Sequence, residues 1–119
     1  LAAATTPSGE DPALLQQRAI RSVQQLYDAL AARDYERARG YVSPQAADQF
    51  DPNDLEQYEQ VAIQDLHVTG QTGTSIQLEG VVNLLQPDGS RHLETRSFSV
   101  EAASEPARVT ASAFGRVLR

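Results

Sequence analysis

Apolar residues in the first quarter of the chain recur every three or four positions, which indicates one face of an α-helix. The recurring positions are Leu15, Ala19, Val23, Leu26 and Leu30. Asp11 can cap the first turn, and Pro12 suits the first helical position. The pattern therefore predicts an amphipathic helix over residues 12–33.

The chain then reverses twice within a short distance. Asp34 can cap a second helix that ends near Gly40, where a residue able to adopt left-handed backbone is useful. Ser43 and Pro44 repeat the cap-then-proline signal and open a third short helix toward Phe50. These reversals allow the apolar faces of successive helices to meet in one core.

From residue 61 onward the period changes from helical to alternating, which is typical of half-buried strands. Turn signals separate the segments, with Gly-Gln-Thr-Gly at 70–73 and Pro-Asp-Gly at 87–89. The expected strands cover residues 61–69, 74–86, 90–102 and 108–118. Helices followed by a strand meander predict an α+β fold with an antiparallel sheet of about four strands.

The Pro-Asp-Gly turn specifies a register for the hairpin around it. A three-residue loop pairs Leu78 with Phe98, and side chains two positions apart on each strand share one side of the sheet. The end of that side distant from the turn is apolar, so it should face the core. Nearer the turn, the same side receives His92, Glu94 and Arg96.

Charged side chains on a core-facing surface cost free energy unless they are paired or solvated. One interpretation is a polar pocket, in which Gly80 leaves room for the guanidinium of Arg96 to lie across the strands. The alternatives are exposure near the end of the sheet or a β-bulge that turns Leu93 inward. The sequence leaves these interpretations open.

The length of 119 residues corresponds to one domain, which we place at residues 12–119. Residues 1–11 are small, polar and rich in turn formers, so we expect a flexible linker or leader there. Such a segment often follows a signal peptide, a membrane anchor or an upstream domain. The sequence leaves the location unknown: cytoplasmic, or extracytoplasmic if the leader follows an anchor or signal peptide.

Charge and composition exclude several classes of function. A net charge of −6 without a basic stripe argues against nucleic-acid binding, and no apolar run is long enough for direct membrane insertion. The chain has no Cys, no Lys and two His, which excludes thiolate and Schiff-base catalysis and a three-histidine zinc site. The acidic residues at 48–59 lack the spacing of a calcium loop and fit a solvated face. We expect no metal and no cofactor.

The long first helix, its reversal, the Ser-Pro helix and the strand meander resemble the nuclear transport factor 2-like superfamily, a cystatin-like cone fold that includes SnoaL-like and ketosteroid-isomerase-like proteins. The matching positions are Tyr27, Ala29, Leu30, Asp34, Tyr35 and Ala38. The resemblance implies helices packed on the concave face of a curved sheet, with a pocket between them. It also implies dimerisation through the sheet in many members.

The candidate ligand-binding residues are Tyr27, His92, Glu94 and Arg96. Tyr27 lies in the region of the helix-one tyrosine that donates a hydrogen bond in isomerase-like members, although a core tyrosine is the alternative interpretation. No residue matches the catalytic carboxylate base of those enzymes, so we assign no catalytic residue.

Two functions remain open. The first is a non-catalytic binding or assembly domain of a larger, anchored or secreted bacterial protein. The second is a small-ligand enzyme or carrier of the polyketide-cyclase or ketosteroid-isomerase kind. The expected partners are another protein, a small molecule or a second copy bound through the outer hairpin face, where three apolar residues stand among polar ones. These three are Val81, Leu85 and Leu93.

Overall fold

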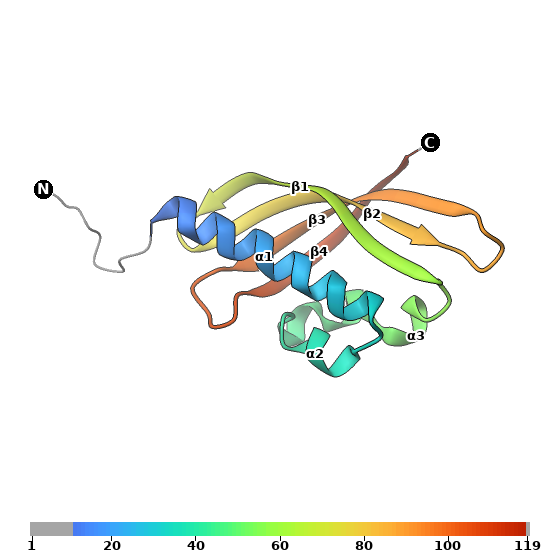
Figure 1. Ribbon diagram of the computed structural model, residues 1–119. Helices are drawn as coiled ribbons and strands as arrows, with labels where there is room; N and C mark the ends of the chain where they lie inside the picture. The colour runs from blue at the N-terminus through green and yellow to red at the C-terminus, as the bar shows by residue number, and fades with distance from the viewer. Residues whose placement is uncertain (1–10, 119) are drawn as a thin grey trace, which may run out of the picture.

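The computed structural model describes residues 11–118, and for Pro52 and Asp54 it describes the backbone alone. Helical segments come first and a four-stranded antiparallel sheet follows, with spatial order β1-β2-β3-β4 (Figure 1). The elements are α1 (Pro12–Ala31), α2 (Tyr35–Arg39), the 3₁₀ helix η1 (Pro44–Phe50), α3 (Pro52–Leu55), β1 (Gln60–Thr72), β2 (Ser75–Leu85), β3 (Arg91–Glu101) and β4 (Arg108–Leu118). The predicted α+β class is confirmed. The expected linker lies outside the described residues except for Asp11.

Helix α1 follows from its sequence pattern. The Asp11 carboxylate accepts a hydrogen bond from the Ala13 N–H at 2.9 Å, and the predicted stripe is buried against the sheet. The helix ends two residues earlier than predicted, because Arg33 takes left-handed backbone at φ 59°. Within residues 11–118 no helix is long and apolar enough to cross a membrane.

The segment after α1 connects the helices to the last strand of the sheet. The Asp34 carboxylate accepts from the Arg37 N–H at 3.2 Å and caps α2, as predicted. Beyond α2, the Ser43 N–H donates to the Val109 carbonyl and the Val109 N–H donates to the Tyr41 carbonyl, both at 2.8 Å. A short parallel bridge thus joins the helical layer to β4.

Strand β1 is longer and more irregular than predicted. It continues through residues 70–72, and its turn into β2 is formed by Gly73 and Thr74, with Gly73 at φ 61°. The pairing with β2 shifts between Gln64 and His67, and Asp65 adopts left-handed backbone at φ 55°. Such bulges bend a strand, and β1 curves over α1 in Figure 1.

The predicted register of the second hairpin is confirmed. Leu78 pairs with Phe98, and β2 and β3 remain in continuous register along their length. The bulge alternative is therefore wrong for this hairpin. A shift occurs instead between β3 and β4, near Thr95, where a Cβ on Gly115 would collide with the Thr95 hydroxyl.

The core lies between α1 and one side of the sheet, which we call the inner face. Its centre is a group of three aromatic rings: Tyr27 meets Phe50 edge-on at 6.2 Å and Phe98 edge-on at 6.0 Å. Leu26 and Leu78 are also almost completely buried. The space between helix and sheet is therefore filled by side chains at this level.

Candidate functional site

His92, Glu94 and Arg96 form a chain of interactions on the inner face near the end of the sheet. One carboxylate oxygen of Glu94 lies 3.0 Å from His92 Nε2, and the other lies 3.5 Å from Arg96 Nη1. The side chains of Glu94 and Arg96 are only 15% and 14% exposed. Both oxygens of the carboxylate are thus engaged, and the exposure alternative is wrong for these two residues.

The guanidinium of Arg96 is held by residues of β4 and η1. Its Nε donates to Ser112 Oγ at 3.1 Å, and its Nη2 donates to Gln49 Oε1 at 2.7 Å, so it connects β3 to β4 and η1. The space above Gly80 is filled from β1, because a Cβ there would lie 3.0 Å from Leu66 Cδ1. The prediction that Gly80 leaves room for Arg96 is therefore wrong.

Tyr27 is a core residue next to this chain of charges. Burial raises the pKa of its hydroxyl well above the ordinary value, while Arg96 lowers it and Glu94 raises it further. The four residues predicted from sequence therefore come together, with Tyr27 inside the core and the other three at its edge. We refer to them as the Tyr27–Arg96 cluster.

The chemistry of the Tyr27–Arg96 cluster favours a structural role. A general base needs a carboxylate or imidazole free to take a proton, whereas Glu94 is engaged by two cationic or potentially cationic partners. The Tyr27 hydroxyl stays protonated near neutral pH, so it is suited to donating a hydrogen bond and unsuited to acting as a base. The arrangement ties β3, β4 and η1 together.

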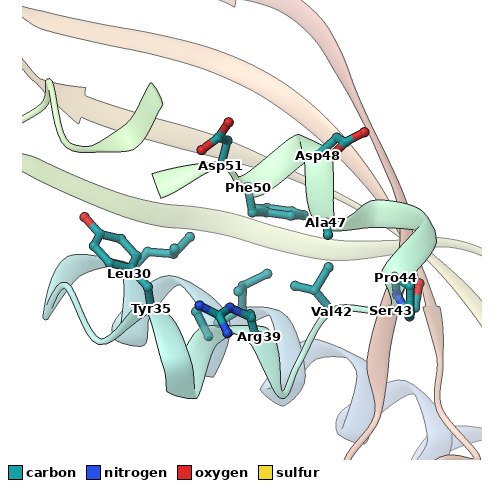
Figure 2. Close-up of a pocket in the computed structure, with 12 residues that line it drawn as sticks. Leu30, Tyr35, Arg39, Val42, Ser43, Pro44, Ala47, Asp48, Phe50 and Asp51 are labelled. Carbon is teal, nitrogen blue, oxygen red and sulfur yellow. The ribbon is translucent and has the colours of Figure 1, made fainter. Parts of the chain in front are cut away.

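A separate cavity lies within the helical layer. Its volume is about 400 Å³, and α1, α2 and η1 supply its walls (Figure 2). The lining residues are Leu26, Leu30, Tyr35, Ala38, Arg39, Val42, Ser43, Pro44, Ala47, Asp48, Phe50 and Asp51. We call it the helical cavity. None of these residues belongs to a strand or to the Tyr27–Arg96 cluster.

The helical cavity and the cluster both contact the helix η1. Phe50 lines the cavity and also meets the ring of Tyr27. Gln49, the preceding residue of η1, accepts from Arg96. The cluster thus holds in place the helix that forms one side of the cavity.

Ser43 is the unusual polar residue of the cavity wall. It is 8% exposed, and its Oγ has no hydrogen-bond partner among the described residues. The sequence predicted that this side chain would cap the third helix, but η1 has no side-chain cap and is a 3₁₀ helix. The Ser43-Pro44 signal predicted the position of the helix correctly. It gave no indication that the Ser43 hydroxyl is buried and unpaired.

The described residues 11–118 contain no group of three or more metal-ligating side chains placed to hold a metal ion. His67 lies on the outer face, 3.8 Å from Glu79, far along the sheet from His92 in the register. The expectation of no cofactor stays a prediction.

Comparisons with known proteins give the fold. No family model matches the chain, and no curated protein matches it. Among solved structures, it is similar to the crystal structure of a "putative aromatic ring hydroxylase" from Novosphingobium aromaticivorans. The TM-score is 0.69 at 11% identity, over 92% of this chain and 94% of that chain. At this identity the similarity shows a common α+β fold.

Proposed function

We propose that this chain is a non-catalytic binding domain with the nuclear transport factor 2-like cone fold, and that its ligand is a small molecule held in the helical cavity. The fold shared with the Novosphingobium protein supports the superfamily resemblance. The name of the Novosphingobium protein refers to an aromatic ring, and the cavity is large enough for a small aromatic molecule.

The observation that carries the proposal is the helical cavity itself. Its volume of about 400 Å³ falls at the lower end of the range for small-molecule sites, and most of its lining is apolar. The lining residues Arg39, Ala47 and Asp48 are exposed, so the cavity is open to solvent and a ligand can enter it.

The enzyme alternative is supported by the hydroxylase name of the Novosphingobium protein, but the chemistry of the cluster does not favour it. An isomerase-like reaction would need a free carboxylate base beside hydrogen-bond donors. In the Tyr27–Arg96 cluster the carboxylate of Glu94 is already paired on both sides. Turnover of enolisable ketones by the purified protein, abolished in a Glu94→Gln variant, would favour the enzyme over the binding domain.

The test uses naphthalene as an uncharged, apolar probe and follows backbone amide chemical shifts. We expect saturable shifts at residues 35–51 and few at residues 91–101. Ala47 lines the cavity while remaining exposed, so Ala47→Leu should fill the space with little loss of stability and weaken binding by about 10-fold or more. Ala13→Leu, an exposed helical change away from the cavity, is the control and should bind as the unchanged protein does. Absence of saturable binding would refute the proposal.

We also propose that the outer face of the sheet mediates assembly with a second copy. In support, Leu93 stands opposite Leu118 in the register, and Val81 and Leu85 are half-buried beside them. The surrounding side chains are mostly polar, as in the rim of many partner surfaces. Sedimentation at increasing concentration should detect dimers, and Leu93→Glu should reduce them; a monomer throughout would contradict self-association.

A further inference from the structure

We infer that the ligand of the helical cavity is a monocarboxylate with a flat apolar body, and that Arg39, an exposed residue of the lining, recognises its carboxylate. This inference rests on the proposed binding function. It adds the chemical class of the ligand and the residue that determines specificity.

The helical cavity is apolar at one end and charged at the other. Leu26, Leu30 and Phe50 are buried residues of its lining. Arg39 and Asp48 line the same cavity and are exposed, so they lie where the cavity opens to solvent. A ligand with an apolar body and one charged end matches this polarity, because the body leaves water while the charged end stays partly hydrated.

Arg39 decides the sign of the charge that the opening accepts. A guanidinium stays protonated at any ordinary pH, and its parallel N–H donors match the two oxygens of a carboxylate. Figure 2 shows Arg39 on the α2 side of the cavity, across from Phe50 of η1. Within the described residues, Arg39 forms no ion pair with Asp48 or Asp51, the two carboxylates of the lining. Its charge is therefore open to a ligand anion.

The carboxylates of Asp48 and Asp51 limit the charge of that anion. In Figure 2 both are turned away from the α2 side of the cavity. One oxygen of Asp51 accepts from the Asn53 N–H at 2.9 Å, so this carboxylate is directed toward α3. They would still repel a doubly charged group, such as a phosphate monoester, more strongly than a single negative charge. A monocarboxylate therefore fits the opening better than a phosphate.

The experiment compares three probes of similar size at neutral pH: naphthalene, the 2-naphthoate anion and the 2-naphthylmethylammonium cation. Binding is measured by amide chemical shifts on the unchanged protein, Arg39→Gln and Arg39→Lys. The unchanged protein should bind 2-naphthoate most tightly. The ratio of naphthalene to 2-naphthoate dissociation constants should fall about 3- to 5-fold in Arg39→Gln, the effect of one well-placed exposed ion pair. Arg39→Lys keeps the charge and should preserve part of the ratio.

Two controls separate recognition by Arg39 from a general effect of charge. Arg37 is also exposed and also lies in the last turn of α2, but it does not line the cavity. Arg37→Gln should therefore leave the ratio unchanged. Added salt should lower the ratio in the unchanged protein and have little effect on it in Arg39→Gln, because salt screens exposed charges.

The possible results distinguish this inference from the proposed function. An unchanged ratio in Arg39→Gln, an equal fall in Arg37→Gln, or tightest binding of the ammonium probe would overturn the inference while naphthalene binding still supports the proposed function. Failure of all three probes to bind would refute the proposed function itself.

Discussion

The sheet and the helical layer differ in how they treat buried polar atoms. At the end of the inner face of the sheet, Glu94 and Arg96 are little exposed, yet each is engaged by two or more partners. In the helical layer, one buried hydroxyl, that of Ser43, has no partner within the described residues and lines a cavity. Saturated polar groups stabilise a fold, whereas the cavity among the helices offers a mostly apolar lining to a ligand. This difference is the basis for proposing a structural role for the end of the sheet and a recognition role for the helices.

The largest effect should come from the aromatic core that both regions share. Phe98→Ala removes a ring that is 2% exposed and meets Tyr27, and it should lower the free energy of unfolding by about 3–5 kcal/mol. Urea denaturation measures the change. Phe114→Ala is the control, because that ring is 53% exposed and its loss should cost far less. Equal losses from the two changes would contradict the placement of the core.

The second effect tests the structural role assigned to the Tyr27–Arg96 cluster. Glu94→Gln leaves Arg96 without its carboxylate partner, and we expect a loss of about 1–3 kcal/mol in stability. Naphthalene binding should nevertheless persist, because no residue of the cluster lines the cavity and Arg96 keeps its hydrogen bond to Gln49 of η1. Glu105→Gln removes an ion pair with Arg18 in which the carboxylate is 84% exposed, and it should cost about 0.5 kcal/mol or less. If Glu94→Gln lost naphthalene binding while its stability stayed unchanged, the cluster would serve ligand binding and its structural role would be refuted.

The third effect is absent near neutral pH and appears only in alkaline solution. The unfolded chain releases the Tyr27 proton near pH 10, whereas burial keeps the folded pKa higher. Above about pH 10 the unfolded state therefore binds fewer protons, and stability falls by about 1.4 kcal/mol per pH unit from this residue until its folded pKa is reached. Tyr27→Phe should show a shallower alkaline decline than the unchanged protein in urea titrations. Parallel declines would mean that the hydroxyl is accessible to water.

Much of the sheet could be predicted because strand register follows local rules. The Pro-Asp-Gly turn and the two-residue period placed Leu78 opposite Phe98, and the bounds of β4 were correct. The turn between β1 and β2 was misplaced because Gly70 and Gly73 are equally good turn formers in sequence. Only Gly73 takes positive φ, and pairing with β2 extends β1 through residue 72.

The candidate site was harder to predict, since it depends on contacts between distant segments. The sequence brought His92, Glu94 and Arg96 to one side of a strand, but their saturation depends on Gln49 and Ser112, far away in the chain. The helical cavity could not be predicted at all, because empty space is a property of packing and leaves no periodic signal. Ser43 looked like an ordinary cap in its local context.

The bridge between Val42 and Val109 has a consequence for the integrity of the whole protein. β4 is an outermost strand, and its open backbone groups could template the addition of strands from other molecules. The Val109 N–H donates to the Tyr41 carbonyl and the Ser43 N–H donates to the Val109 carbonyl, and these bonds, with η1 alongside, cover part of that edge. A proteolytic cut that released the helices would uncover it. Residues 41–43 precede the sheet in sequence and cover part of the β4 edge, so they should help to prevent fibril formation through that strand.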